Sequence, residues 1–174
     1  MTLAVCLLLD ERADATVRGL WRRLEEVGVP TLLTHTHGHH VPHLTWVALR
    51  TYDLAAVREA LGALPAQPPL ALHLDAFGTF RRSRCWLAPA VTAELVARQA
   101  AVVEAMTGTD ADLHRHYTPG SWVPHLTLAP RLHLSDLATV AALVYDVLPI
   151  AATGVSTALI DTSTGARHSL QHPV

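Results

Sequence analysis

The chain has 174 residues, of which 50% are hydrophobic and 16% charged, and its formal net charge is −2. This length and composition predict a folded unit of about one domain and exclude a disordered chain. The charge balance excludes a globally basic surface for long nucleic acid, so a small nucleotide or a chain end is the better partner.

Apolar spacing predicts an alternation of strands and helices along the chain. Residues 3–9 form an apolar run with no cationic segment before it and Asp10-Glu11-Arg12 after it, so we expect a buried strand and not a signal peptide. No apolar stretch is long enough to span a membrane. Helices are expected over about 17–27, 54–64, 95–107 and 136–144, the last capped by Ser135. Strands are expected over about 43–49, 70–75, 85–87, 125–129 and 150–160, with a short one near 169.

The cysteine content indicates a reducing compartment. Cys6 and Cys85 are the two cysteines of the chain, and they form neither a CxxC motif nor a multi-cysteine framework. We therefore expect two reduced thiols in a cytoplasmic protein.

A five-residue repeat is the most informative motif. The pentapeptide Val-Pro-His-Leu-Thr occurs at residues 41–45 and again, letter for letter, at 123–127. Side chains alternate between the faces of a strand, so His43 and Thr45 share one face while Leu44 points to the other. The second copy behaves in the same way. Two such strands facing each other would enclose two imidazoles and two hydroxyls.

This set of groups suits phosphodiester chemistry. A neutral imidazole can accept a proton from attacking water while a protonated one donates to the leaving oxygen. His43 and His125 can take these two parts. Thr45 and Thr127 can donate hydrogen bonds to the non-bridging phosphoryl oxygens. Neither motif contains a carboxylate cluster of the kind that a two-metal site requires, so we expect no metal.

The motifs at residues 43–46 and 125–128 match an HxTx signature, and the chain resembles the two-histidine (2H) phosphoesterase superfamily along its whole length. That superfamily includes the bacterial 2′,3′-cyclic phosphodiesterases often labelled 2′-5′ RNA ligases. The resemblance implies one α+β domain over residues 1–174 with a bilobal, pseudo-twofold fold. Two antiparallel-sheet lobes with outer helices would flank a central cleft that carries both HxTx strands. It also implies cleavage of cyclic or 2′-5′ phosphodiesters without a cofactor.

Carried onto this chain, the resemblance makes His43 the proton donor and His125 the acceptor, with Thr45 and Thr127 binding phosphate. Family members tend to have an arginine directly after the second motif strand. Here a proline intervenes before Arg131, which is the corresponding candidate for substrate binding.

Other residues are candidates for substrate contact. Tyr117 and Trp122 precede the second motif, and they would either stack a base or pack at the lobe junction. Arg82 lies in an arginine-rich hairpin turn that is either a solvated face or a phosphate contact. The remaining tryptophans are expected in the core: Trp21, Trp46 and Trp86.

A histidine-rich segment precedes the first motif. His35, His37, His39 and His40 could hold zinc or nickel. No cysteine or carboxylate lies among them, which favours a solvated loop at the mouth of the cleft.

These observations favour a metal-independent hydrolase of 2′,3′-cyclic phosphate ends. Its partners would be RNA ends or small cyclic nucleotides, not a membrane, and we expect a monomer. The alternatives are hydrolysis of 2′-5′ oligonucleotides or of ADP-ribose cyclic phosphate, a non-catalytic module that binds RNA ends, and a metal-binding protein that uses the histidine-rich segment.

Overall fold

The structure is a computed structural model that describes residues 2–81, 84–170 and 173–174. Its α-helices are α1 (Glu11–Glu26), α2 (Leu54–Gly62), α3 (Ala93–Thr107) and α4 (Leu137–Tyr145). Its strands are β1 (Leu3–Leu9), β2 (His43–Leu49), β3 (Leu70–Thr79), β4 (Cys85–Pro89), β5 (Leu126–Ala129), β6 (Ile150–Asp161) and β7 (Arg167–Ser169). Two short 3-10 helices are η1 (Arg115–Tyr117) and η2 (Leu134–Asp136). None of the helices within the described ranges is long and apolar enough to cross a membrane.

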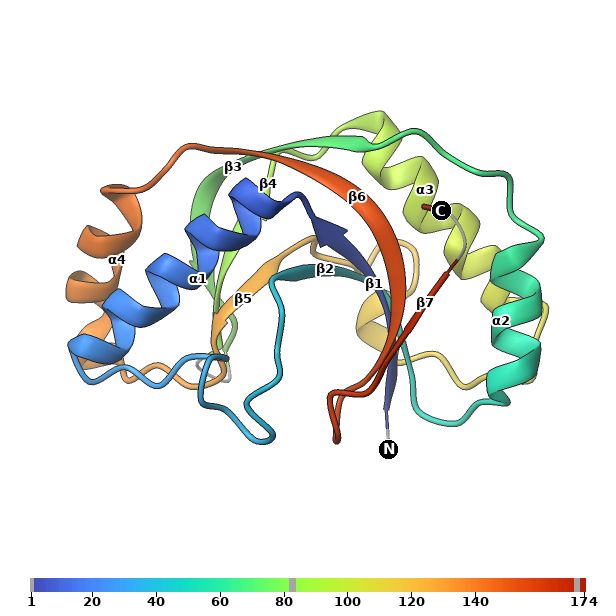
Figure 1. The fold of residues 1–174 in the computed structure, drawn as a ribbon, viewed down its shortest axis with the longest axis horizontal. Helices are drawn as coiled ribbons and strands as arrows, with labels where there is room; N and C mark the ends of the chain where they lie inside the picture. The colour runs from blue at the N-terminus through green and yellow to red at the C-terminus, as the bar shows by residue number, and fades with distance from the viewer. Residues whose placement is uncertain (1, 82–83, 171–172) are drawn as a thin grey trace.

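The strands form one antiparallel sheet in the order β2-β1-β6-β3-β4-β5, with β7 paired to β6. The two motif strands, β2 and β5, therefore lie at opposite ends of the sheet. The sheet arches so strongly that these ends come together (Figure 1), and the indole Nε1 of Trp122 donates to the carbonyl oxygen of Thr45 at 3.1 Å. The predicted α+β fold with antiparallel strands and outer helices is confirmed. The strands of its two halves are joined through β6 and β3.

The helices divide between the two halves of the arch. α1 and α4 pack together beside one half, and α2 and α3 pack beside the other (Figure 1). Their buried faces include Val17, Leu20 and Trp21 of α1, each at most 1% exposed. Burial of this apolar stripe follows the three- and four-residue spacing that predicted the helix.

The starts of α1 and α2 follow ordinary helix-capping chemistry. The Asp10 and Asp53 carboxylates accept hydrogen bonds from Ala13 N and Ala56 N, at 3.0 and 2.8 Å. The predicted cap at Ser135 is wrong. That residue lies inside η2, and its hydroxyl donates to the Asp136 carboxylate at 3.0 Å. The chain already turns through η2, so α4 begins without a side-chain cap.

Candidate active site

The two motif histidines have the same local geometry. His43 is the first residue of β2, and His125 immediately precedes β5. In each ring, Nδ1 lies 2.7 Å from the carbonyl oxygen two residues earlier, that of Val41 or Val123. A carbonyl can only accept, so Nδ1 carries the hydrogen in both rings. The other nitrogen, Nε2, is therefore the one available for proton transfer.

Strand alternation turns the apolar residues of both motifs into the core. Leu44 is 0% exposed and Leu126 is 1% exposed, and both belong to the main hydrophobic cluster. The preceding residues, His43 and His125, are half-buried. The face that carries each imidazole is therefore the one turned away from the main core, as the period of two predicted.

The charge on His43 is stabilised by neighbouring acceptors. Burial opposes the charged ring, but the electrostatic attraction and hydrogen bond of the Cys6 sulfur, with the Val41 carbonyl, outweigh it and raise the pKa of His43 to about 9. The ring then has a hydrogen-bond acceptor for each of its two N–H groups. The protonated ring, the imidazolium, is the form of histidine that can act as a general acid.

The second motif histidine is shifted the other way. Burial lowers the pKa of His125 to about 4; the Val123 carbonyl opposes this change, while the nearby charges of Arg84 and His43 add to it. Phe80 lies edge-on to the ring, with 4.9 Å between ring centroids, and Trp86 lies at 6.2 Å. A neutral imidazole beside aromatic rings and a cation is suited to accept a proton.

The threonines have different surroundings. Thr45 is buried, its hydroxyl lies 3.8 Å from the Cys6 sulfur, and its side chain also hydrogen-bonds to Tyr117. Thr127 is half-buried and lies opposite Trp86 in the register of β4 and β5. The first motif is thus held by a polar network, whereas the second borders aromatic rings.

The two aromatic candidates near the second motif lie beside the first. The Trp122 ring packs on Trp46 with 6.0 Å between ring centroids, and its indole N–H donates a hydrogen bond to the Thr45 carbonyl oxygen. Of its two predicted roles, these contacts favour packing where the two halves meet. Tyr117 contacts Thr45 from η1, and its own carbonyl accepts a hydrogen bond from Gln99 at 2.8 Å.

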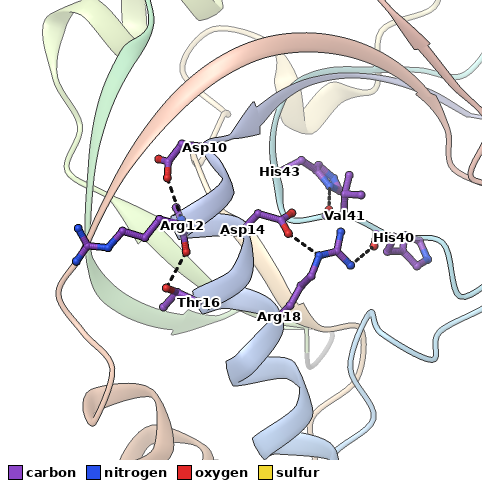
Figure 2. A network of polar contacts seen from close by, with 9 residues as sticks. Asp10, Arg12, Asp14, Thr16, Arg18, His40, Val41 and His43 are labelled. Atoms are coloured by element: carbon purple, nitrogen blue, oxygen red, sulfur yellow. Dashed lines mark hydrogen bonds and ion pairs between the residues drawn. The ribbon is translucent and has the colours of Figure 1, made fainter.

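The segment that leads into β2 is held by α1. The Arg18 guanidinium donates to the Asp14 carboxylate at 2.6 Å and to the His40 carbonyl at 3.2 Å (Figure 2). The same view shows, next to these contacts, the hydrogen bond between the His43 ring and the Val41 carbonyl oxygen. Arg18 thereby ties the approach to the first motif histidine to a rigid helix.

The histidine-rich segment packs against itself and against the β6–β7 turn. The His37 and His40 rings have centroids 4.1 Å apart, and a Cβ added at Gly165 would lie 2.6 Å from the His37 ring. Burial, together with the charges of His37, His43 and His35, lowers the pKa of His40 to about 4. Within the described ranges, no group of three or more His, Cys, Asp or Glu side chains is arranged to hold a metal ion.

The arginine candidates differ in position. Arg82 lies outside the described residues. Arg131 is exposed, and its charge helps to lower the pKa of His35, so it lies on the side of the histidine-rich segment. Arg84 immediately precedes β4, and its charge helps to lower the pKa values of both His35 and His125. Arg84 is therefore the described arginine whose charge acts on a motif histidine.

Three further residues of the site were not predicted from the sequence to belong to it. Cys6 contacts the first motif, while Phe80 and Trp86 line the ring of His125. Trp86 was expected in the core, but it is half-buried and its ring covers Gly78, where a Cβ would lie 2.3 Å from the indole. The local signal for Trp86 was its place one residue after the start of a strand that follows an arginine-rich turn.

Comparison with solved structures identifies the same fold elsewhere. The apo form of E. coli LigT matches with a TM-score of 0.64 and 17% identity, over 98% of this chain and 94% of that one. TT0787 of Thermus thermophilus matches with a TM-score of 0.61 and 16% identity, over 98% and 96% of the two chains. A third structure, described as a phosphoesterase, matches with a TM-score of 0.62 and 15% identity, over 97% and 92%. No curated protein matches by sequence.

The model of one protein family matches residues 11–166, a range that includes both HxTx motifs. The family is described as the 2′-5′ RNA ligase superfamily. The arched antiparallel sheet that brings the two motif strands together agrees with that assignment. The chain belongs to the 2′-5′ RNA ligase superfamily, that is, to the two-histidine phosphoesterases.

Proposed function

We propose that this protein hydrolyses 2′,3′-cyclic phosphodiester ends of RNA or of nucleotides, with His43 as general acid and His125 as general base. One observation carries the proposal. Two rings of identical local geometry have pKa values shifted in opposite directions, to about 9 for His43 and about 4 for His125. Near neutral pH, one ring therefore holds a proton and the other can accept one.

The reaction balances with these two groups. A water molecule attacks phosphorus while His125 Nε2 takes one of its protons. The bond between phosphorus and one ribose oxygen breaks, and that oxygen receives the proton from His43 Nε2. The product is a ribose 2′- or 3′-phosphomonoester, and the two rings end with exchanged charge states. Both proton transfers are supplied by imidazoles, so no metal-bound water is needed.

The developing negative charge requires donors on the non-bridging oxygens. Thr45 and Thr127 stand two residues after the motif histidines and can supply one hydroxyl each. Arg84 brings a positive charge near His125 and would attract the phosphate from the second motif's side.

A nucleotide substrate is consistent with a neighbour of the same fold. E. coli LigT has been crystallised with 3′-AMP, in a structure that matches this chain with a TM-score of 0.61. We infer that a ribonucleotide end is the substrate class here also. No contact among the described residues favours 2′-5′ oligonucleotides or ADP-ribose cyclic phosphate over a 2′,3′-cyclic end.

A substrate panel tests the proposal. Cyclic mononucleotides, RNA with a cyclic end, 2′-5′ dinucleotides and ADP-ribose cyclic phosphate are each incubated with the protein in EDTA. Phosphorus NMR then assigns the product. We expect the 2′,3′-cyclic compounds to be hydrolysed to a single phosphomonoester, at the same rate with EDTA as without it. Turnover of 2′-5′ dinucleotides alone, or activity that chelation abolishes and zinc or manganese restores, would contradict the proposal.

Two variants provide the controls for this panel. His43→Ala and His125→Ala should each lower kcat by about 10²–10⁴-fold, the usual contribution of one general acid or base. The double variant should lose less than the product of the two single losses, because the two rings act in one step. Folded variants that keep full activity would make both histidines structural. Binding of cyclic-ended RNA without turnover by the parent protein would favour the non-catalytic alternative.

A further inference from the structure

Cys6 lies against the first motif although it is far from it in sequence. It is 0% exposed, and it stands opposite Thr45 in the register of β1 and β2. It belongs to a small cluster that is otherwise apolar and that occupies the face of β1 turned away from the main core, with Ala4, Ala158 and Ile160. A thiol in such a cluster is more polar than packing alone requires.

A break in the register accompanies this placement. The pairing of β1 with β2 shifts between Val5 and Cys6, so Val5 stands opposite Val47 while Cys6 stands opposite Thr45. A shift of this kind leaves one residue of the partner strand unpaired and re-aims the side chains next to it. The irregularity thus lies directly at the first motif.

The sulfur contacts both functional side chains of that motif. It lies 3.8 Å from the Thr45 hydroxyl oxygen, and its electrostatic attraction and side-chain hydrogen bonding raise the pKa of His43. His43 Nδ1 is committed to the Val41 carbonyl, so Nε2–H is the group free to make this bond. That is the N–H from which the acid would release its proton.

The second motif has a different neighbour at the matching position. In the register of β4 and β5, the residue opposite Thr127 is Trp86, which brings an aromatic ring where β1 brings a thiol. The two copies of the motif are identical in sequence, so their immediate cross-strand neighbours make their surroundings different.

We propose that Cys6 is a positioning residue for the acid: its sulfur holds the His43 ring and the Thr45 hydroxyl in the arrangement from which the ring protonates the leaving oxygen. The inference that this proton reaches a leaving group rests on the proposed function, whereas the effect of Cys6 on His43 does not. Before substrate binds, the sulfur stabilises the charged ring. The leaving oxygen then replaces the sulfur as acceptor.

Several other groups face the His43 ring or its immediate partners. His40 lies before it in the chain, and His125 lies across the site; both are positively charged when protonated, and each is influenced by His43. The Tyr117 phenol contacts Thr45 and is influenced by Cys6. The Asp14–Arg18 ion pair of α1 reaches the His40 carbonyl (Figure 2). Among the described causes that raise the pKa of His43, Cys6 is the side chain and Val41 contributes its backbone carbonyl.

The test replaces the sulfur and follows the His43 ring directly. The NMR titration of its Hε1 proton, assigned by its absence from His43→Ala, is recorded for the parent protein and for Cys6→Ala. We expect the titration midpoint to fall by about 1–3 pH units, the range for loss of a close favourable partner. The alkaline limb of kcat/KM should fall with it, and kcat should drop while KM changes little.

Cys85→Ala is the matched control, because Cys85 is also 0% exposed and lies in a strand next to the second motif. It should leave the midpoint of His43 unchanged. Cys6→Ser is the second variant if Cys6→Ala fails to fold, as judged by circular dichroism. The serine hydroxyl can still accept a hydrogen bond but carries no charge, so the electrostatic attraction of the Cys6 sulfur is lost and the midpoint should lie below that of the parent. An unchanged midpoint in a folded Cys6 variant would overturn the proposal, whether or not the protein hydrolyses cyclic phosphates. A shifted midpoint in a protein without such activity would overturn the proposed function alone.

Discussion

Between about pH 4 and about pH 9, kcat/KM for a 2′,3′-cyclic nucleotide should stay nearly constant, and it should fall tenfold per pH unit beyond either limit. The limits are the pKa values of His125 and His43. With these pKa values, roughly 1 in 1,000 His125 rings is protonated at pH 7, and roughly 1 in 100 His43 rings is neutral. Almost every molecule then has both rings in the required state.

The assay measures initial rates at low substrate concentration, with adenine and uracil cyclic nucleotides compared. Each of these bases titrates near one limit, so a limb shared by both substrates belongs to the protein. A narrow bell with both limbs close to 6.5, the ordinary pKa of histidine, would refute the reasoning. It would mean that neither Cys6 nor the surroundings of His125 shift the pKa values of the two rings apart.

The same profile would result if the two roles were exchanged, so the leaving group must assign them. A p-nitrophenyl phosphodiester needs little acid assistance because its leaving phenolate is stable. His43→Ala should therefore lose far less activity on it than on a cyclic nucleotide. His125→Ala should lose about as much on both substrates. The opposite pattern would make His43 the base.

Other expectations follow from the same structure. Thr45→Val and Thr127→Val should each lower kcat by about 10²–10³-fold, as measured by steady-state kinetics, because each deletes one hydroxyl donor and keeps the branched shape; an effect on KM alone would contradict a role in the transition state. Arg84→Gln should raise only the acidic limit of the pH profile, since its charge helps to keep His125 neutral. Gly154→Ala should destabilise the fold by about 1–3 kcal/mol in urea unfolding, because its Cβ would lie 2.3 Å from a leucine side chain of β1. Gly62→Ala is the control, because a Cβ added at Gly62 would have no atom within 4 Å.

Local patterns in the sequence were sufficient for much of the fold. The alternation of Leu70, Leu72 and Leu74 with polar or small residues predicted a half-buried strand, and those leucines are at most 5% exposed. Asp53, the residue directly before the predicted helix over 54–64, caps α2. Such features depend on neighbours within a few residues, so periodicity and capping rules reach them.

The residues that contact the two motifs could not be predicted from such local patterns. Cys6 meets Thr45 across 39 residues of sequence, through a register that shifts at that point. Phe80 reaches His125 because β3 extends to Thr79, beyond the strand that alternation indicated, and Trp86 reaches it through the pairing of β4 with β5. Cross-strand register is set by tertiary pairing, which a single sequence does not contain.

The identity of the two pentapeptides explains why the sequence alone could not distinguish the acid from the base. Each copy fixes Nδ1 on a carbonyl two residues earlier, so the motif determines only which nitrogen is free. The charge of each ring depends on what the rest of the sheet brings to it. On one side β1 brings a sulfur that favours the proton on His43, and on the other side burial, aromatic rings and Arg84 disfavour a proton on His125. A duplicated motif can therefore supply two opposite chemical roles when its copies pair with different strands, and changing the residue opposite one threonine should alter one role and leave the other intact.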